Sequence, residues 1–240
     1  MKKAGTPFRN RFVAHAAVAL TSYLLGGLAH EKQFFPFDYF WRSENALAED
    51  HLSAPAIEPR ITMFEAFSPN ADIVMIGDSI TQAGEWREIF PNRNIANRGV
   101  AGDTTDDILN RMPTIAAVQA SKAFVMAGVN DFLVGRSVED VYTNLVRIVT
   151  RLQTRGMTVF LQSTLECSRS VCGGILESIR LLNHRLAEYA STNGLSYIDI
   201  NQNITSARDG LLSQYSYDGI HLLGGGYLAW RDTLEPYISQ

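Results

Sequence analysis

Short apolar runs alternate with amphipathic segments from Asp72 to the end of the chain, and this alternation constrains the fold more than any other feature. The runs are apolar on both faces, as strands inside a parallel sheet tend to be. They cover residues 73–76, 94–97, 123–127, 158–161 and 197–200. Strands that alternate with helices in this way predict a three-layer α/β domain with right-handed crossovers.

Signals for helix ends lie between these runs. Thr104 with Asp107, and Ser137 with Asp140, match the capping box, in which two side chains bond the free backbone groups at a helix start. Gly156 follows the helix predicted after Ser137, and glycine readily takes the left-handed conformation that closes many helices. These signals support helices as the connections between the strands.

Polar residues and a glycine follow the predicted strands. Ser79 comes after the first strand, Gly102 after the second and Asn130 after the third, while Asp218 and His221 come after the last. In an open parallel sheet, ligands bind outside the carboxyl ends of the strands. We therefore expect these residues to share one rim of the sheet and to form a site there.

The same residues match a serine nucleophile and its helpers. His221 can take the proton of the Ser79 hydroxyl and return it to the leaving group, while Asp218 orients the imidazole and stabilises its cation. The developing oxyanion needs donors, for which we expect the Ser79 N–H, the Gly102 N–H and the Asn130 side-chain amide. The Gly102 N–H is expected to approach the oxyanion closely, because glycine has no Cβ atom in the way. The pattern predicts acyl transfer through an acyl-serine intermediate.

The sequence blocks around these residues resemble those of the SGNH (GDSL-type) hydrolases. The matching blocks, in the family's order, are Gly77-Asp78-Ser79, Gly102, Gly128-x-Asn130-Asp131 and Asp218-x-x-His221. Residues 77–112 are most similar to the branch of platelet-activating-factor acetylhydrolase and bacterial carbohydrate acetylesterases. The resemblance covers about residues 72–237.

The resemblance implies a flavodoxin-like sheet of five parallel strands, the triad and oxyanion hole named above, and chemistry without a metal or cofactor. It also implies cleavage of acyl esters. We expect a serine esterase that removes short acyl groups, above all acetyl, from a carbohydrate or other cell-envelope substrate. The enzymatic alternatives are a lysophospholipase or thioesterase and an O-acyltransferase with the same triad. A non-catalytic glycan-binding envelope protein is the alternative of another class.

Several neighbouring residues have structural interpretations. Asp78 and Asp131 are expected to accept hydrogen bonds that fix loops, and Trp86 is expected to pack under the site. The glycine run at residues 224–226 is expected to let the final helix approach His221 closely. None of these residues is assigned a chemical step.

Composition limits the number of domains and the kind of partner. A chain of 240 residues with 46% hydrophobic content can bury one sizeable core, which predicts one domain and an appendage. The formal charge is −4, and no stripe of Lys and Arg follows the first dozen residues. Nucleic acid is therefore not an expected partner. The predicted acyl-transfer chemistry makes a small-molecule, glycan or lipid ester the expected one.

The amino-terminal part, residues 1–30, predicts a membrane anchor or a signal sequence. Basic residues precede the apolar residues 12–29, which as a helix would be about 27 Å long, close to the hydrocarbon thickness of a bilayer. An anchor and a cleaved signal peptide both fit, and both put the catalytic part on the extracytoplasmic side. Residues 31–69 are predicted to be a linker or wrapping arm, and residues 70–240 the catalytic domain.

The two cysteines, Cys167 and Cys172, are separated by only four residues. In an oxidising compartment they would close a small disulfide loop, and a pair of free thiols is the alternative. A zinc site is disfavoured, because the chain has no further cysteine and His184 is the only imidazole near them in sequence.

Overall fold

The computed structural model describes residues 58–239, which belong to a compact unit that begins at Glu58. The predicted anchor or signal sequence (residues 1–30), with its hydrophobic helix, and residues 31–57 of the predicted linker lie outside the described residues. Between Glu58 and Ser239, no helix is both long and apolar enough to span a bilayer.

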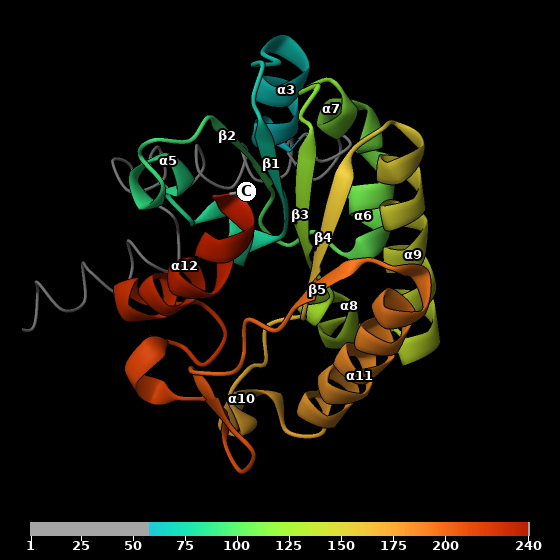
Figure 1. The fold of residues 1–240 in the computed structure, drawn as a ribbon. Coiled ribbons are helices and arrows are strands. Elements are labelled where there is room, and N and C mark those ends of the chain that lie inside the picture. The colour runs from blue at the N-terminus through green and yellow to red at the C-terminus, as the bar shows by residue number, and fades with distance from the viewer. Residues whose placement is uncertain (1–57, 240) are drawn as a thin grey trace, which may run out of the picture. The chain divides into compact units, whose positions relative to one another are not determined.

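The core of the unit is a five-stranded parallel sheet (Figure 1). Its strand order is β2-β1-β3-β4-β5, which confirms the predicted α/β class and the parallel sheet. Ile73 of β1 pairs with Ile95 on one side and with Lys122 on the other. The strands are β1 (Ile73–Gly77), β2 (Ile95–Gly99), β3 (Lys122–Met126), β4 (Thr158–Gln162) and β5 (Ser196–Ile198).

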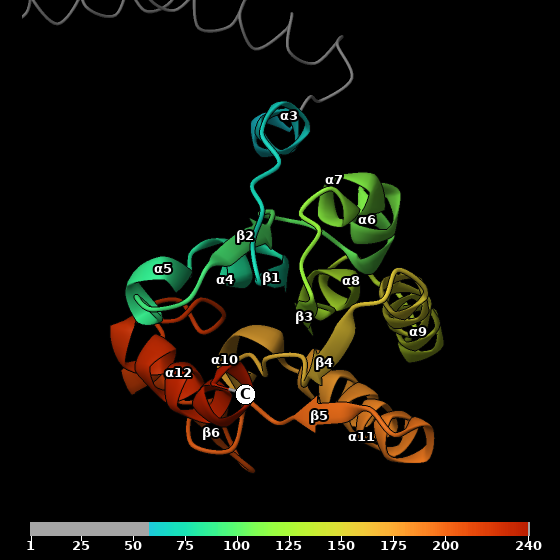
Figure 2. The ribbon, with the colours of Figure 1, turned by 45° about the horizontal axis from the view of Figure 1, so that its top comes forward.

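Helices cover both faces of the sheet (Figure 2). One face carries α5 and α12, whose Trp86 and Trp230 rings meet edge to face with their centroids 4.9 Å apart. The other face carries α6, α8, α9 and α11, of which α9 packs on β4 and α11 on β5. These helices are α5 (Trp86–Ile89), α12 (Gly224–Ile238), α6 (Thr105–Asn110), α8 (Val129–Leu133), α9 (Val138–Thr154) and α11 (Ile175–Asn193).

Shorter elements complete the unit at the edges of these layers. They are α3 (Pro59–Ala66), α4 (Ser79–Gln82), α7 (Met112–Ala116), α10 (Arg169–Cys172), the antiparallel pair β6 (Thr205–Ser206) and β7 (Gly210–Leu211), and the 3₁₀-helix η1 (Ser213–Tyr215).

Both predicted capping boxes are confirmed. The pair at Thr104 opens α6 and the pair at Ser137 opens α9, and in each the side chain of the third helical residue bonds back to the cap. Gly156, with φ of +83°, follows the end of α9 as predicted. Local sequence signals therefore predicted where these helices begin and end.

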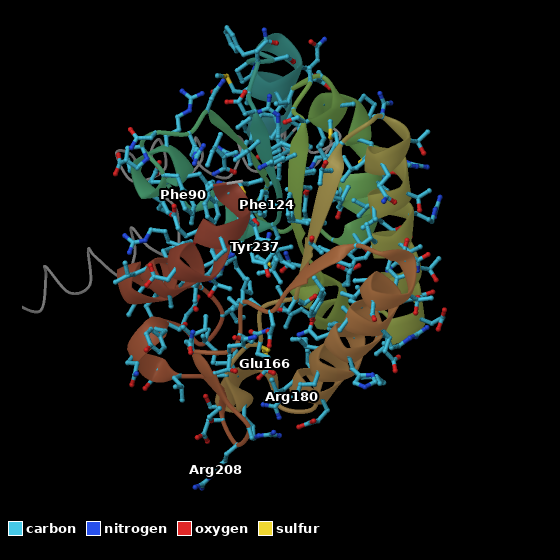
Figure 3. The ribbon with its side chains drawn as sticks, viewed as in Figure 1. Phe90, Phe124, Glu166, Arg180, Arg208 and Tyr237 are labelled. Atoms are coloured by element: carbon cyan, nitrogen blue, oxygen red, sulfur yellow. A yellow bond between two sulfur atoms is a disulfide. The ribbon has the colours of Figure 1, made fainter. Side chains whose placement is uncertain are left out.

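Aromatic rings fill the centre of the sheet. The Phe124 and Phe160 rings stack with their centroids 4.5 Å apart, and the Tyr237 ring packs against Phe160 (Figure 3).

Helix α3 lies where the sequence predicts a linker. Glu58 caps its first turn, and Phe64 is its one buried residue. The Phe64 ring lies under the guanidinium groups of Arg60 and Arg98, at 5.1 and 4.2 Å from its centroid. Arg60 also donates to the Gly99 carbonyl at 2.6 Å. A helix with one buried position shows no helical periodicity in the sequence, so the pattern did not predict it. Tertiary contacts with Arg98 and Gly99 of β2 hold it in place.

Candidate active site

The three predicted triad residues lie in hydrogen-bonding contact. Ser79 Oγ is 2.9 Å from Nε2 of His221, although 142 positions separate the two residues in the sequence. His221 Nδ1 is 2.6 Å from Oδ2 of Asp218. The serine is half-buried, and the histidine and aspartate side chains are 31% and 36% exposed, so the group is open to a ligand. This is the nucleophile–base–orienting acid arrangement of serine acyl transfer.

Asp78 fixes the turn that presents Ser79 at the first position of α4. Asp78 is the N-cap residue, and its Oδ1 accepts the Ile80 N–H at 3.0 Å, which confirms its predicted role in fixing a loop. Its other carboxylate oxygen is buried and has no partner among the described residues. Burial therefore raises the pKa of Asp78 to about 7, against the lowering effects of the Ile80 N–H and of His221.

The turn at residues 216–222 holds the imidazole and the carboxylate together. Asp218 Oδ1 accepts the backbone N–H groups of Ile220 and His221 at 2.9 and 2.7 Å. Burial acts to raise the pKa of Asp218, but the hydrogen bonds from the His221 side chain and from these N–H groups outweigh it and lower the pKa to about 2. The buried Ser216 hydroxyl accepts the Gly219 N–H and donates to the His221 carbonyl at 2.7 Å. The carboxylate is therefore ionised and aimed at Nδ1.

The cysteine pair lies against this turn. Cys167 and Cys172 form a disulfide, and the N–H of Ser168 inside the loop donates to the Gly219 carbonyl at 2.7 Å. A Cβ atom on Gly219 would lie 2.3 Å from Oγ of Ser168, so the two segments are in close contact. The sequence predicts the disulfide loop but not its contact with the 216–222 turn, because only the fold brings them together.

Two of the predicted oxyanion donors, Gly102 and Asn130, follow the strands on either side of β1. Gly102 follows β2 and Asn130 follows β3, and β1, which ends just before Ser79, lies between those strands. Within residues 58–239, the N–H groups of Ser79 and Gly102 donate no hydrogen bond to the protein. The Asn130 amide donates to the Asp103 carbonyl at 3.0 Å, which ties it to the Gly102 loop.

Backbone conformation gives a further reason for glycine at position 102. Gly102 has φ of +81°, a conformation that residues other than glycine rarely adopt. A Cβ atom there would meet no protein atom within 4 Å, so packing against the protein does not require glycine. Close approach of its N–H to the oxyanion of a substrate stays a prediction.

A buried ion pair, which no sequence pattern indicated, holds the Gly102 loop. Arg111 Nε lies 2.5 Å from Oδ2 of Asp103, and the two side chains are 3% and 7% exposed. The same guanidinium donates to the carbonyls of Gly77 and Arg98, at the carboxyl ends of β1 and β2. Burial raises the pKa of Asp103 to about 6, although Arg111 acts to lower it. The ion pair thus joins the carboxyl end of β1, which precedes Ser79, to the Gly102 loop.

Asp131 and Trp86 have the structural roles predicted for them. The Asp131 carboxylate accepts both the N–H and the hydroxyl of Thr105, at 2.9 and 2.6 Å. Trp86 is buried and donates its indole N–H to the Thr81 carbonyl at 2.9 Å. Both residues therefore support the loops around the site and make no contact that suggests chemistry.

The glycine run at the start of α12 differs from its prediction. A Cβ atom on Gly226 would lie 2.8 Å from the Leu222 side chain and 3.0 Å from the Tyr215 carbonyl. A Cβ atom on Gly224 would meet nothing within 4 Å. Only Gly226 is thus sterically required, and it lets α12 approach the 216–222 turn through Leu222, not His221 itself.

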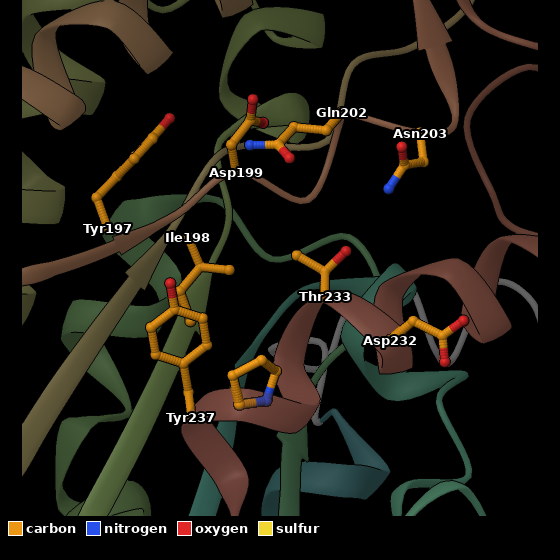
Figure 4. A pocket seen from close by; sticks show the side chains of 9 residues that line it. Tyr197, Ile198, Asp199, Gln202, Asn203, Asp232, Thr233 and Tyr237 are labelled. Carbon is orange, nitrogen blue, oxygen red and sulfur yellow. The ribbon is translucent and has the colours of Figure 1, made fainter.

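A hollow on the described surface lies apart from the triad. The hollow between β5 and α12, lined in part by Tyr197, Asp199, Asp232 and Tyr237, includes no residue of the triad or of the predicted oxyanion hole (Figure 4). Within residues 58–239, no group of three or more His, Cys, Asp or Glu side chains is placed to hold a metal ion.

Comparison with known sequences relates the chain to other proteins over this unit. It is 26% identical over 165 residues to the N-acylneuraminate cytidylyltransferase of Streptococcus agalactiae, covering 65% of this chain but 36% of that protein. The chain therefore spans about a third of the length of that relative. It is 24% identical over 180 residues to platelet-activating factor acetylhydrolase IB subunit alpha2 of Gallus gallus, covering 70% of this chain and 76% of the relative.

A solved structure and a family model agree with this relation. The fold matches a GDSL-like lipase from Bacteroides thetaiotaomicron with a TM-score of 0.66 and 21% identity, over 74% of this chain and 94% of the other. The model of the GDSL-like lipase/acylhydrolase family matches residues 75–229, which include every predicted triad and oxyanion residue. The chain belongs to the GDSL-like lipase/acylhydrolase family of hydrolases.

Proposed function

We propose that this protein is a serine esterase that removes short acyl groups, above all acetyl, from carbohydrate or other cell-envelope substrates. The observation that carries the proposal is the pair of hydrogen bonds that joins Ser79 through His221 to Asp218, at 2.9 and 2.6 Å. Family membership supports the cleavage of esters. The acetyl group and the carbohydrate are a more specific part of the proposal, which family membership alone does not supply.

In the acylation step, Ser79 Oγ attacks the carbonyl carbon of the ester, and its proton passes to Nε2 of His221. Charge on the former carbonyl oxygen is stabilised by the N–H groups of Ser79 and Gly102 and by the Asn130 amide. The carbon–oxygen bond to the alcohol then breaks, and Nε2 gives the proton to the departing oxygen. Asp218 stabilises the imidazolium while it exists and is not itself protonated.

In the deacylation step, a water molecule attacks the acyl-serine and gives one proton to His221. The bond between the acyl carbon and Ser79 Oγ breaks, the carboxylic acid leaves, and the serine recovers its proton from Nε2. Each turnover therefore consumes one water and one ester and releases one acid and one alcohol.

The names of two relatives support the proposed acetyl group and carbohydrate. One is an acetylhydrolase, which supports the acetyl group, and the name of the other contains a sugar, an N-acylneuraminate, which supports the carbohydrate. A longer acyl chain is the second candidate, because Leu133 and Val134, shortly after Asn130, are 46% and 67% exposed. An exposed apolar surface at the end of the helix that carries Asn130 is suited to contact with such a chain.

The test is hydrolysis of p-nitrophenyl esters from acetyl to dodecanoyl by the full-length protein, with Ser79→Ala and the matched control Ser191→Ala on the exposed side of α11. We expect activity to be highest on acetyl, to vanish in Ser79→Ala and to persist in the control. Turnover retained by Ser79→Ala would remove this serine from the mechanism. A maximum at long chains would favour the second candidate, and acyl transfer to an added sugar in place of water would favour an O-acyltransferase.

The proposed location is the extracytoplasmic side of a membrane, with residues 1–30 as an anchor or a cleaved signal. The Cys167–Cys172 disulfide supports this location, because such bonds persist in oxidising compartments. Fractionation of producing cells and the mass of the mature chain test it. A full-length chain in the cytoplasmic fraction would contradict both versions.

A further inference from the structure

Tyr217 is an exposed aromatic residue inside the 216–222 turn. Its side chain is 68% exposed, the most exposed large hydrophobic side chain in the part of the chain that the structure describes. Its ring lies nearly parallel to the His221 imidazole, with centroids 5.8 Å apart and planes 15° apart. A large aromatic surface beside a reactive imidazole is a candidate for contact with a ligand.

The residue that Tyr217 stacks on also contacts the nucleophile. Nε2 of His221 lies 2.9 Å from Ser79 Oγ. Tyr227 of α12 donates its hydroxyl to the carbonyl of Ile80, the residue after Ser79, at 2.8 Å. Tyr217 therefore lies beside the imidazole that serves Ser79, on the turn that holds this imidazole in place.

The chemistry of the proposed reaction decides which part of a substrate occupies the space beside this imidazole. The departing alcohol receives its proton from Nε2 of His221, so its oxygen must lie within hydrogen-bonding reach of the imidazole. The acyl oxygen lies instead on the side of the oxyanion donors, after β2 and β3. A side chain stacked beside the imidazole thus borders the alcohol and not the acyl group.

We propose that Tyr217 is a specificity-determining residue that forms the platform of a leaving-group subsite for a sugar ring. A phenol ring gives a flat apolar surface, on which the C–H face of a pyranose packs, while its hydroxyl stays in water. The proposal rests on the esterase function proposed above and deepens it, because it assigns the carbohydrate to a particular residue.

The test compares two acetate esters that form the same acetyl-serine, namely an acetylated methyl glucoside and ethyl acetate. Deacylation is then identical, and kcat/KM reports acylation, in which the alcohol is still bound. We expect Tyr217→Ala to lower kcat/KM about three- to tenfold on the glucoside and to leave ethyl acetate within about a factor of two. Tyr217→Phe keeps the ring and should behave as the wild type on both esters.

Leu181→Ala is the matched control, since it removes another exposed apolar side chain (54% exposed) on α11. An equal loss on both esters, with a shifted pH profile of kcat/KM, would show that Tyr217 only positions His221. No loss on the glucoside, or a loss in Tyr217→Phe as large as in Tyr217→Ala, would also overturn the proposal. So would a wild type that cleaves the glucoside no faster than ethyl acetate. Failure of the esterase function itself is distinguishable, because the wild type would then cleave neither ester, whereas failure of the Tyr217 proposal alone leaves a wild type that cleaves ethyl acetate and a Ser79→Ala variant that does not.

Discussion

The two sides of the site are built in different ways. On the base side, Asp218 and His221 are three residues apart, partly exposed, and held by short-range bonds within one turn. On the oxyanion side, Gly102 and Asn130 follow different strands, and the buried Asp103–Arg111 pair joins them to the end of β1. Changes on the base side should therefore affect chemistry more than stability, whereas changes on the oxyanion side should affect both.

Between these two sides, the largest loss of activity is expected for Asp218→Asn. An amide cannot stabilise the imidazolium as a carboxylate does, so kcat should fall by about 10⁴-fold. The free energy of unfolding should change by less than about 1 kcal/mol, because the carboxylate is 36% exposed. Steady-state kinetics and urea denaturation of the same preparation measure both. A loss of stability as large as that for a buried charge would remove the distinction between the two sides.

Arg111→Met should give the largest loss of stability. It leaves the buried Asp103 carboxylate without its partner, which typically costs about 3–5 kcal/mol, measured by urea denaturation. Addition of Asp103→Asn to this variant should recover part of the loss, because no buried charge then remains unpaired. kcat should fall in both variants, since the Gly102 loop loses its link to β1. Unchanged stability in Arg111→Met would contradict the role given to the pair.

Asn130→Ala should lower kcat by about 10²–10³-fold with a small change in KM, because an oxyanion donor acts mainly in the transition state. Asn193→Ala is the matched control, since it removes an equivalent side-chain hydrogen bond to a carbonyl, at 2.8 Å, on the exposed surface of α11. The control should keep full activity. A higher KM with unchanged kcat would place Asn130 in ground-state binding only.

The last prediction concerns the pH dependence of stability. The pKa of Asp78 is raised to about 7, so its protonated form favours the folded state. The native state then binds more protons than the unfolded chain between about pH 4 and 7, and stability falls as pH rises through this window. The slope from one group is at most about 1.4 kcal/mol per pH unit.

Asp78→Asn should flatten that slope relative to the wild type, as measured by urea denaturation between pH 4 and 7.5. Asp103 contributes with the same sign, so the comparison between the two proteins isolates Asp78. Asp218 affects stability with the opposite sign and at lower pH. Its pKa is lowered to about 2, so its charged form favours the folded state, and this stabilisation is lost as pH falls from about 4 toward 2. Identical slopes in the variant and the wild type would contradict the raised pKa of Asp78.

Local patterns in the sequence determined much of this protein. Runs of apolar residues predicted all five strands of the sheet, and the capping boxes at Thr104 and Ser137 predicted where α6 and α9 begin. The residues now in hydrogen-bonding contact, Ser79, Asp218 and His221, were predicted because their types and order match one chemistry. Strand burial, helix capping and motif spacing each act over a few residues, so a linear sequence shows them.

Only the tertiary structure decided the rest. It brought Arg111 to Asp103 and to the end of β1, formed α3 around one buried phenylalanine, and stacked Tyr217 beside His221. It also showed that Gly102 has a positive φ, a backbone conformation that favours glycine. These features depend on which segments meet after folding, and a burial or a contact between distant segments leaves no periodic pattern in the sequence.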